Sequence, residues 1–180
     1  MTDDIILVDD KDNQIGTGEK MAVHKAGKLH RAFSIFVFNS QRELMLQKRA
    51  SGKYHCGGLW TNTCCSHPRP NENLIEATKR RLQEEMGFGC DLEEVLSFIY
   101  KVKFDNGLVE HEFDHVLVGK FDSEPEINPD EVEDWRWIKM EDLFKDIKLN
   151  PDNYTPWFRI LMEDHRLQIT NLYKFTNIII

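Results

Sequence analysis

One stretch organises the chain, Leu59-Trp60-Thr61-Asn62-Thr63-Cys64-Cys65-Ser66-His67-Pro68, and it places a thiol and an imidazole two residues apart. The stretch follows a flexible Gly57-Gly58 pair and precedes an acid-rich segment from Glu72 to Gly87. Thiols and imidazoles carry protons and bind metals readily near neutral pH. Their spacing here, beside a carboxylate-bearing helix pattern, predicts a functional site rather than a purely structural element.

The size and charge of the chain limit its class. Its 180 residues and mass of 21.2 kDa predict a single domain over residues 1–180, long enough to bury a sizeable core. The hydrophobic fraction of 41% is typical of a globular fold. The net charge of −8 argues against general binding to nucleic acid or to acidic membranes.

The termini and cysteines favour a cytoplasmic protein. No apolar run approaches the ~20 residues of a membrane span. The chain begins Met1-Thr2-Asp3-Asp4, which is acidic where a signal peptide would be basic. Cys56, Cys64, Cys65 and Cys90 are therefore expected to be reduced thiols. We expect no nucleic-acid or membrane partner, and a monomer or weak homodimer.

The order of hydrophobic patterns predicts an α+β fold. Strands are predicted at Ile5–Val8, Asn13–Thr17, His30–Phe38, Glu43–Arg49, Leu92–Phe104, Leu108–Phe121 and Glu131–Ile138. Helices are predicted at Asn73–Met86, Met140–Phe144 and Pro156–Ile169, while Met21–Gly27 fits a helical turn or a loop and Ala50–Gly58 fits a surface loop. Hairpins with helices packed on the sheet are typical of this class.

Three imidazoles and two carboxylates are candidate metal ligands. They are His24, His30, His67, Glu110 and Glu112. Glu110 and Glu112 stand at i and i+2 on a predicted strand, so both side chains point to one face. Such a donor set suits a divalent ion such as zinc or manganese. His111 and His115 face the opposite side of that strand from the glutamates, and His55 and His165 have no evident partner in the sequence. All four are interpreted as ordinary histidines.

The acid-rich helix carries a spaced motif, Ser66-x5-Glu72-x7-Arg80-Arg81-Leu82-Gln83-Glu84-Glu85-Met86-Gly87-Phe88. The motif resembles the Nudix box, in which carboxylates within about one helical turn hold magnesium against a diphosphate. It departs from that box at Ser66, where glycine is usual, and at Arg81, where glutamate is usual. Because Arg81 removes a metal-binding carboxylate, the motif argues against ordinary Nudix hydrolysis.

The wider sequence resembles the type I isopentenyl diphosphate isomerases of the Nudix superfamily. The resemblance rests on Thr61 to Pro68, on the altered box and on Gly107-Leu108-Val109-Glu110-His111-Glu112, and it runs from Lys20 past Trp157. It implies a Nudix-type α/β/α sandwich with mixed or antiparallel sheets and helices on both sides. It also implies the reversible conversion of isopentenyl diphosphate to dimethylallyl diphosphate in isoprenoid synthesis.

The resemblance assigns roles by position. His24, His30, His67, Glu110 and Glu112 are implied to hold one divalent ion (Mn²⁺, Zn²⁺ or Mg²⁺), and Glu85 a Mg²⁺ that bridges to the diphosphate. Cys65 and Glu112 are implied to be the two acid/base groups. The implied substrate contacts are Lys20, Arg49 and Lys53 to the diphosphate and Tyr100 and Trp157 to the hydrocarbon. One departure is Gly57, where a proline is common, and it is expected to affect loop stiffness rather than chemistry.

The implied roles agree with the chemistry of moving a double bond by protonation and deprotonation. Protonating an alkene yields a tertiary carbocation, which aromatic faces stabilise by roughly 0.5–2 kcal/mol each. One group must deliver a proton and another must remove one, and the sequence leaves their order open. Two alternatives remain, a Nudix pyrophosphohydrolase and a non-catalytic metal- or phosphate-binding module. In a non-catalytic module, Cys65→Ser would leave the function intact.

Overall fold

The computed structural model describes residues 3–164, and within them the strands form one mixed sheet. The strands are β1 Asp4–Val8, β2 Gln14–Glu19, β3 His30–Phe38, β4 Glu43–Arg49, β5 Trp60–Thr61, β6 Cys64–Ser66, β7 Leu92–Lys103, β8 Val109–Lys120 and β9 Val132–Lys139. The helices are α1 Lys20–Ala26, α2 Leu74–Met86, α3 Met140–Leu149 and α4 Pro156–Asp164, with a 3₁₀ turn, η1, at Pro151–Asn153.

Strand β3 is the centre of the sheet. It pairs in parallel with β8 along one edge, from His30 with Glu112 to Phe38 with Lys120. Its other edge pairs in succession with β1, β6 and β4, all antiparallel. Ser34 pairs with both Cys65 of β6 and Val116 of β8, so β6 and β8 flank β3 on opposite sides.

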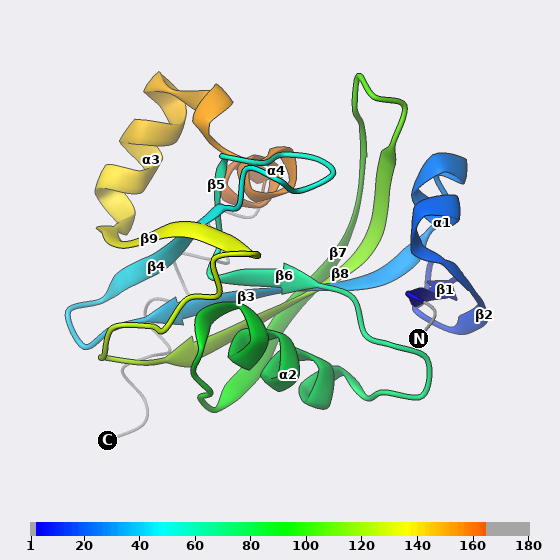
Figure 1. The fold of residues 1–180 in the computed structure, drawn as a ribbon, viewed down its shortest axis with the longest axis horizontal. Coiled ribbons are helices and arrows are strands. Elements are labelled where there is room, and N and C mark those ends of the chain that lie inside the picture. The colour runs from blue at the N-terminus through cyan, green and yellow to red at the C-terminus, as the bar shows by residue number, and fades with distance from the viewer. Residues whose placement is uncertain (1–2, 165–180) are drawn as a thin grey trace.

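The alternation of side chains along β3 builds two cores, one on each face of the sheet. Phe36 and Phe38 pack in a cluster with α3 and α4. Phe33, Ile35 and Val37 pack in a second cluster with α2. Successive residues of a strand point to opposite faces, which is why an unbroken apolar run serves both layers. Figure 1 shows α2 on one side of the sheet and α3 and α4 on the other.

The predicted α+β sandwich with helices on both sides is therefore confirmed. Residues 21–27 lie largely in helix α1 rather than in a loop, and the short helix predicted at Met140–Phe144 extends to Leu149. The end of the helix predicted to Ile169, and the apolar tail at Ile178–Ile180, lie outside the described residues. Between residues 3 and 164, no helix is both long and apolar enough to cross a membrane.

Candidate active site

A row of paired residues crosses three strands and forms the floor of the site. Glu112 of β8 pairs with His30 of β3 on one side and with Tyr100 of β7 on the other. Paired residues project from the same face of a sheet. The Tyr100 hydroxyl donates to Glu112 Oε2 at 2.5 Å, and His30 Nε2 lies 3.5 Å from Glu112 Oε1. The register of the sheet thus delivers both neighbours to the Glu112 carboxylate.

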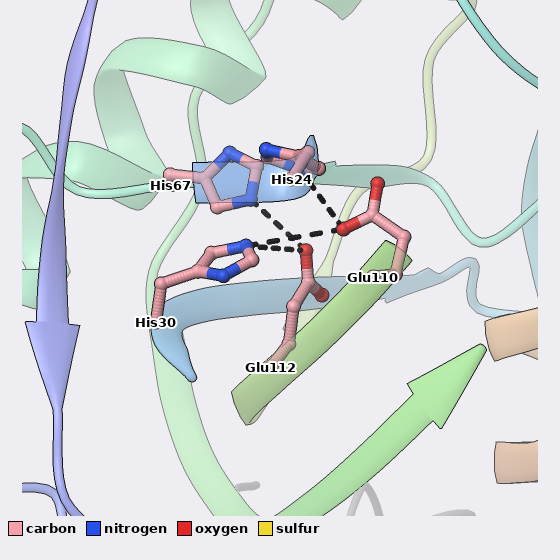
Figure 2. A group of neighbouring side chains, drawn as sticks. All are labelled: His24, His30, His67, Glu110 and Glu112. Atoms are coloured by element: carbon pink, nitrogen blue, oxygen red, sulfur yellow. Dashed lines mark hydrogen bonds and ion pairs between the residues drawn. The ribbon is translucent and has the colours of Figure 1, made fainter. Parts of the chain in front are cut away.

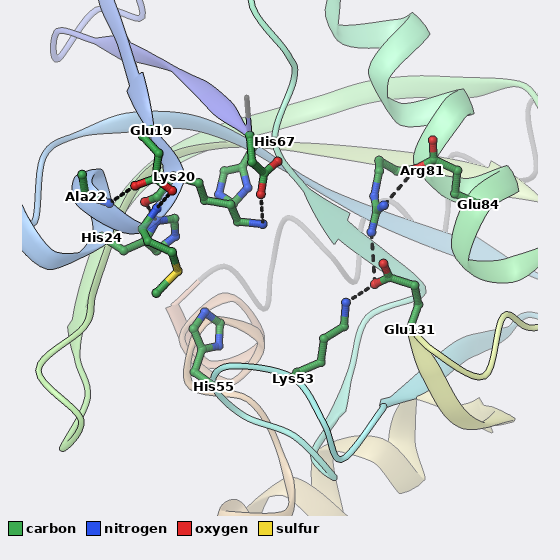
Figure 3. Close-up of polar contacts among 12 residues, drawn as sticks. Glu19, Lys20, Ala22, His24, Lys53, His55, His67, Arg81, Glu84 and Glu131 are labelled. Carbon is green, nitrogen blue, oxygen red and sulfur yellow. Dashed lines mark hydrogen bonds and ion pairs between the residues drawn. The ribbon is translucent and has the colours of Figure 1, made fainter. Parts of the chain in front are cut away.

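Helix α1 brings in His24. The Glu19 side chain caps the helix by accepting from the backbone N–H groups of Met21 and Ala22. Figure 3 shows the bond to Ala22. One turn later the His24 Nδ1–H donates to the carbonyl of Lys20 at 2.6 Å. This bond selects the tautomer that leaves a lone pair on Nε2. The helix therefore presents a fixed nitrogen donor to the sheet.

The five predicted metal ligands converge. The donor atoms of His24, His30, His67, Glu110 and Glu112 all lie within 4.8 Å of one another. Figure 2 shows the imidazoles facing the two carboxylates of β8. His24 Nε2 is 3.1 Å from Glu110 Oε2, yet neither atom has a hydrogen bond of normal geometry, and His30 Nε2 also lacks one. Buried donors that approach without pairing suit a shared cation, so these residues fit a divalent ion.

The charges of the cluster favour a cation as well. Burial raises the pKa of Glu112, but the close contact with His30 and the hydrogen bond from His67 outweigh it and hold that pKa well below its usual range. The pKa of Glu110 is also lowered, because contacts with His24 and His55 outweigh burial and the nearby Glu112. Burial lowers the pKa of His67 to about 4. The site therefore combines two ionised carboxylates with an imidazole that stays neutral.

The two adjacent cysteines of β6 face opposite sides of the sheet. Cys64 is fully buried in the α2 core, while Cys65 faces the pocket. Burial raises the pKa of Cys65 to about 12, although the nearby guanidinium of Arg49 opposes this shift. Arg49 Nη1 lies 3.9 Å from the Cys65 sulfur, and its guanidinium lies 5.3 Å from the centroid of the Trp157 ring. Cys65 thus keeps its proton at neutral pH.

Two of the basic side chains that line the pocket, Lys53 and Arg81, are held by acidic partners. Lys53 and Arg81 both form ion pairs with Glu131, and Figure 3 shows them meeting there. Glu85 is buried and takes bonds from Arg81 and, at 2.9 Å, from the amide of Gln47. Arg81 thus neutralises Glu85 where a Nudix hydrolase would have another carboxylate. Glu131 and Gln47 were missed by sequence reasoning, because no local pattern links them to the motif.

One pocket joins these groups. Its lining includes the predicted residues Lys20, Arg49, Lys53, Cys65, His67, Glu85, Tyr100, Glu110, Glu112 and Trp157. His24 and His30 are completely buried in the adjoining cluster.

His55 corrects the sequence interpretation. We interpreted it as an ordinary histidine in a surface loop, but it is buried and lines the pocket. Its Nε2 lies 2.5 Å from Glu110 Oε1. The aperiodic loop from residue 50 to 58 gave no pattern from which to predict this contact. The one sequence feature that points to this loop is Lys53, which the family resemblance assigns to the diphosphate.

Comparison with known proteins identifies the family. The NUDIX domain profile matches residues 28–158. Over 148 residues the chain is 57% identical to isopentenyl-diphosphate Delta-isomerase 2 of Aromatoleum aromaticum, covering 82% of this chain and 78% of that protein. The chain belongs to the isopentenyl-diphosphate Delta-isomerase family, within the NUDIX proteins. A second relative, the isopentenyl-diphosphate Delta-isomerase of Serratia proteamaculans, is 52% identical, covering 79% of this chain and 80% of its own.

Solved structures support the fold of the family. A protein from Deinococcus radiodurans superposes with a TM-score of 0.69 at 20% identity, covering 82% of this chain and 90% of its own. A MutT NUDIX hydrolase from Burkholderia pseudomallei gives a TM-score of 0.60 at 21% identity, covering 76% and 97%. At these identities the likeness establishes the NUDIX fold and nothing about the reaction.

Proposed function

We propose that this protein interconverts isopentenyl diphosphate and dimethylallyl diphosphate. Membership of the isomerase family supports this reaction. The observation that carries it is the placement of a thiol and a carboxylate in one pocket, Cys65 and Glu112. Burial raises the pKa of Cys65, and contacts with His30 and His67 lower that of Glu112. A 1,3-proton shift needs one proton donor and one proton acceptor beside the carbon chain.

The proton transfers balance between these two groups. One group adds a proton to the terminal alkene carbon, which leaves a tertiary carbocation. The other removes a proton from the carbon between the cation and the CH₂–O group, and the double bond forms there. Cys65 on β6 and Glu112 on β8 enter from opposite sides of β3, which suits two transfers to one short carbon chain. Each group is the acid in one direction and the base in the other. Before the next turnover, the group that gained a proton must release one and the group that lost a proton must regain one, by exchange with solvent.

Aromatic rings suit the hydrocarbon end. Trp157 and Tyr100 are buried and line the pocket. The faces of aromatic rings attract cations and exclude the water that would capture a carbocation. The Tyr100 hydroxyl also orients the Glu112 carboxylate through its 2.5 Å hydrogen bond. We assign these two residues to the carbon chain of the substrate.

Cationic side chains suit the diphosphate end. We assign Lys20, Arg49 and Lys53 to the phosphate oxygens. Glu85 would hold a Mg²⁺, which would offset the negative charge of the diphosphate. In this structure Lys53 is paired with Glu131, and Glu85 with Arg81, so both would exchange partners when the substrate binds. Binding energy from the diphosphate then holds the short carbon chain in register with Cys65 and Glu112.

The cluster of imidazoles and carboxylates is assigned to a second divalent ion. His24, His30, His67, Glu110 and Glu112 would hold it, with Mn²⁺, Zn²⁺ and Mg²⁺ as the candidates. When bound, the ion would tune the proton affinity of its ligand Glu112. The four thiols are free, which supports the proposed cytoplasmic location. We further propose that the chain acts as a monomer or weak homodimer, without nucleic acid or membrane.

The test separates isomerisation from hydrolysis. The purified protein is incubated with isopentenyl diphosphate and Mg²⁺, with and without Mn²⁺, and the products are separated chromatographically. We expect dimethylallyl diphosphate and no released phosphate. Phosphate release without the isomer would contradict the proposal and favour a pyrophosphohydrolase. Binding of the diphosphate with no product of either kind would favour a non-catalytic module.

A further inference from the structure

His55 is a buried histidine that the proposed reaction does not use. Its side chain lies on the loop between β4 and β5 and is 7% exposed as a residue. The sequence predicted no role for it, and it is outside the cluster of five converging metal ligands. Its Nε2 nevertheless lies 2.5 Å from Oε1 of Glu110, one of those ligands. His55 therefore contacts the carboxylate oxygen of Glu110 that His24 does not contact.

The two oxygens of Glu110 have different partners. Oε2 faces the other ligands, 3.1 Å from His24 Nε2 and 3.9 Å from His30 Nε2, and has no hydrogen bond. Oε1 faces His55. A carboxylate held at one oxygen can rotate less, so its other oxygen stays directed at the ion. His55 is thus placed to fix the orientation of Glu110.

The ring of His55 is itself held firmly. It stacks on Phe104, with centroids 5.0 Å apart and planes 9° from parallel, and meets Trp157 edge to face at 5.6 Å. The backbone carbonyl of His55 accepts from Arg49 Nη2 at 3.5 Å. The neighbouring Tyr54 carbonyl accepts from Asn106 in the β7–β8 turn at 3.3 Å. These contacts anchor the loop on two sides, so the imidazole is a rigid support rather than a passing surface group.

We propose that His55 is a positioning residue for the metal centre, which holds Oε1 of Glu110 so that Oε2 is directed at the ion. The inference rests on the proposed metal site and adds to it a side chain from a separate loop. Because the same ring contacts Trp157, the loop joins the metal centre to the hydrocarbon end of the pocket. His55 acts through Glu110 and is not itself assigned a proton transfer.

Two substitutions of His55, to Asn and to Gln, distinguish the contribution of the Nε2 contact from that of the rest of the imidazole ring. The amide nitrogen of Gln reaches about as far as Nε2 of histidine, whereas that of Asn reaches only as far as Nδ1. We expect His55→Asn to weaken Mn²⁺ binding about 10- to 100-fold, as loss of an outer-shell partner typically does. His55→Gln should keep an affinity within a few-fold of the wild type. The measurement is electron paramagnetic resonance of free Mn²⁺, titrated into full-length protein without diphosphate.

His115→Asn is the matched control. His115 is 8% exposed and contacts two carboxylates, Glu94 at 2.7 Å and Asp12 at 3.2 Å, but it points to the opposite face of β8 from Glu110. Its substitution should leave Mn²⁺ affinity unchanged. Circular dichroism confirms that each variant is folded.

The outcomes are distinct. Unchanged affinity in His55→Asn, or equal losses in His55→Asn and His55→Gln, would overturn the role of His55 and leave the metal site standing. A wild-type protein that binds no Mn²⁺ would overturn both. A wild type that binds Mn²⁺ but forms no dimethylallyl diphosphate would overturn only the proposed reaction.

Discussion

At the scale of single residues, the Cys65 thiol is the sharpest test of proton transfer. We expect Cys65→Ser to lower kcat by about 10²- to 10⁴-fold, the usual contribution of a general acid or base. A hydroxyl fills nearly the same space but gives up its proton far less readily, so substrate binding should survive. The measurements are steady-state kinetics with isopentenyl diphosphate and calorimetric binding of the diphosphate.

Cys64→Ser is the natural control for this variant. Cys64 is adjacent in sequence but buried in the opposite core, so its loss should reduce stability and spare turnover. A Cys65→Ser enzyme with wild-type kcat would remove Cys65 from the acid/base pair.

Arg49 tests the assignment of the diphosphate end. Arg49→Ala removes a buried cation that lines the pocket, and a lost hydrogen bond to a charged group costs about 1.5–3 kcal/mol. We therefore expect KM to rise about 10- to 100-fold. Arg42→Ala, just before the other end of β4, is the control and should leave KM unchanged. Equal KM values for Arg49→Ala and the wild type would argue against the role.

The predictability of the site differs from residue to residue. Glu110 and Glu112 could be placed together because a two-residue step on a strand fixes a common face. Their meeting with His24 and His67 depends on long-range packing. Residue type made these side chains candidates, and the family resemblance assigned them to one ion. His55 was missed, since its loop has no period and its partner Glu110 is 55 residues away. The spacing of residues in the sequence shows which side chains share one face of a strand or helix. It does not show which residues of different strands and helices meet.

At the scale of secondary structure, the end of α2 positions the Glu85 carboxylate. Gly87 closes the helix with φ of 73°, and a side chain there would meet the backbone and side chain of Glu126. Gly107, in the β7–β8 turn, has φ of 84° with open space around it. The two glycines share a left-handed backbone but differ in their surroundings.

We therefore expect Gly87→Ala to destabilise the protein more than Gly107→Ala. Alanine at Gly107 should cost only the left-handed penalty of roughly 1–2 kcal/mol. Alanine at Gly87 adds a clash that pushes the 126–128 segment away from α2, where the Asn128 N–H donates to the Glu85 carbonyl at 2.9 Å. Urea unfolding measures both free energies. Equal losses at the two positions would show that the Glu126 contact carries no cost.

The elements themselves were largely predictable, and their pairing was not. The apolar run of β3, the hydrophobic stripe of α2 and the Asp105-Asn106-Gly107 turn are local signals, and each gave its element within one or two residues. The parallel pairing of β3 with β8 joins residues about 80 apart. No local period encodes such a contact, because it depends on the packing of the whole sheet.

At the scale of the whole molecule, the metal cluster ties together distant parts of the chain. His24 comes from α1, His30 from β3, His67 from the segment after β6 and the glutamates from β8. An ion held by all of them would bind the folded chain and not the unfolded one. Its binding energy would then add directly to the stability of the fold.

Metal removal should consequently lower the melting temperature. At a free Mn²⁺ concentration 100 times its Kd, binding adds about 2.7 kcal/mol, and for a chain of this size each kcal/mol shifts Tm by about 2–4 °C. We expect Tm, measured by calorimetry, to be about 5–10 °C higher with Mn²⁺ than with a chelator. The difference should shrink as the pH falls, since protons compete for the imidazoles and carboxylates. The Glu110→Gln variant lacks one carboxylate ligand and should show a smaller difference in Tm. A wild-type Tm that is the same with Mn²⁺ and with a chelator would contradict an ion at this cluster.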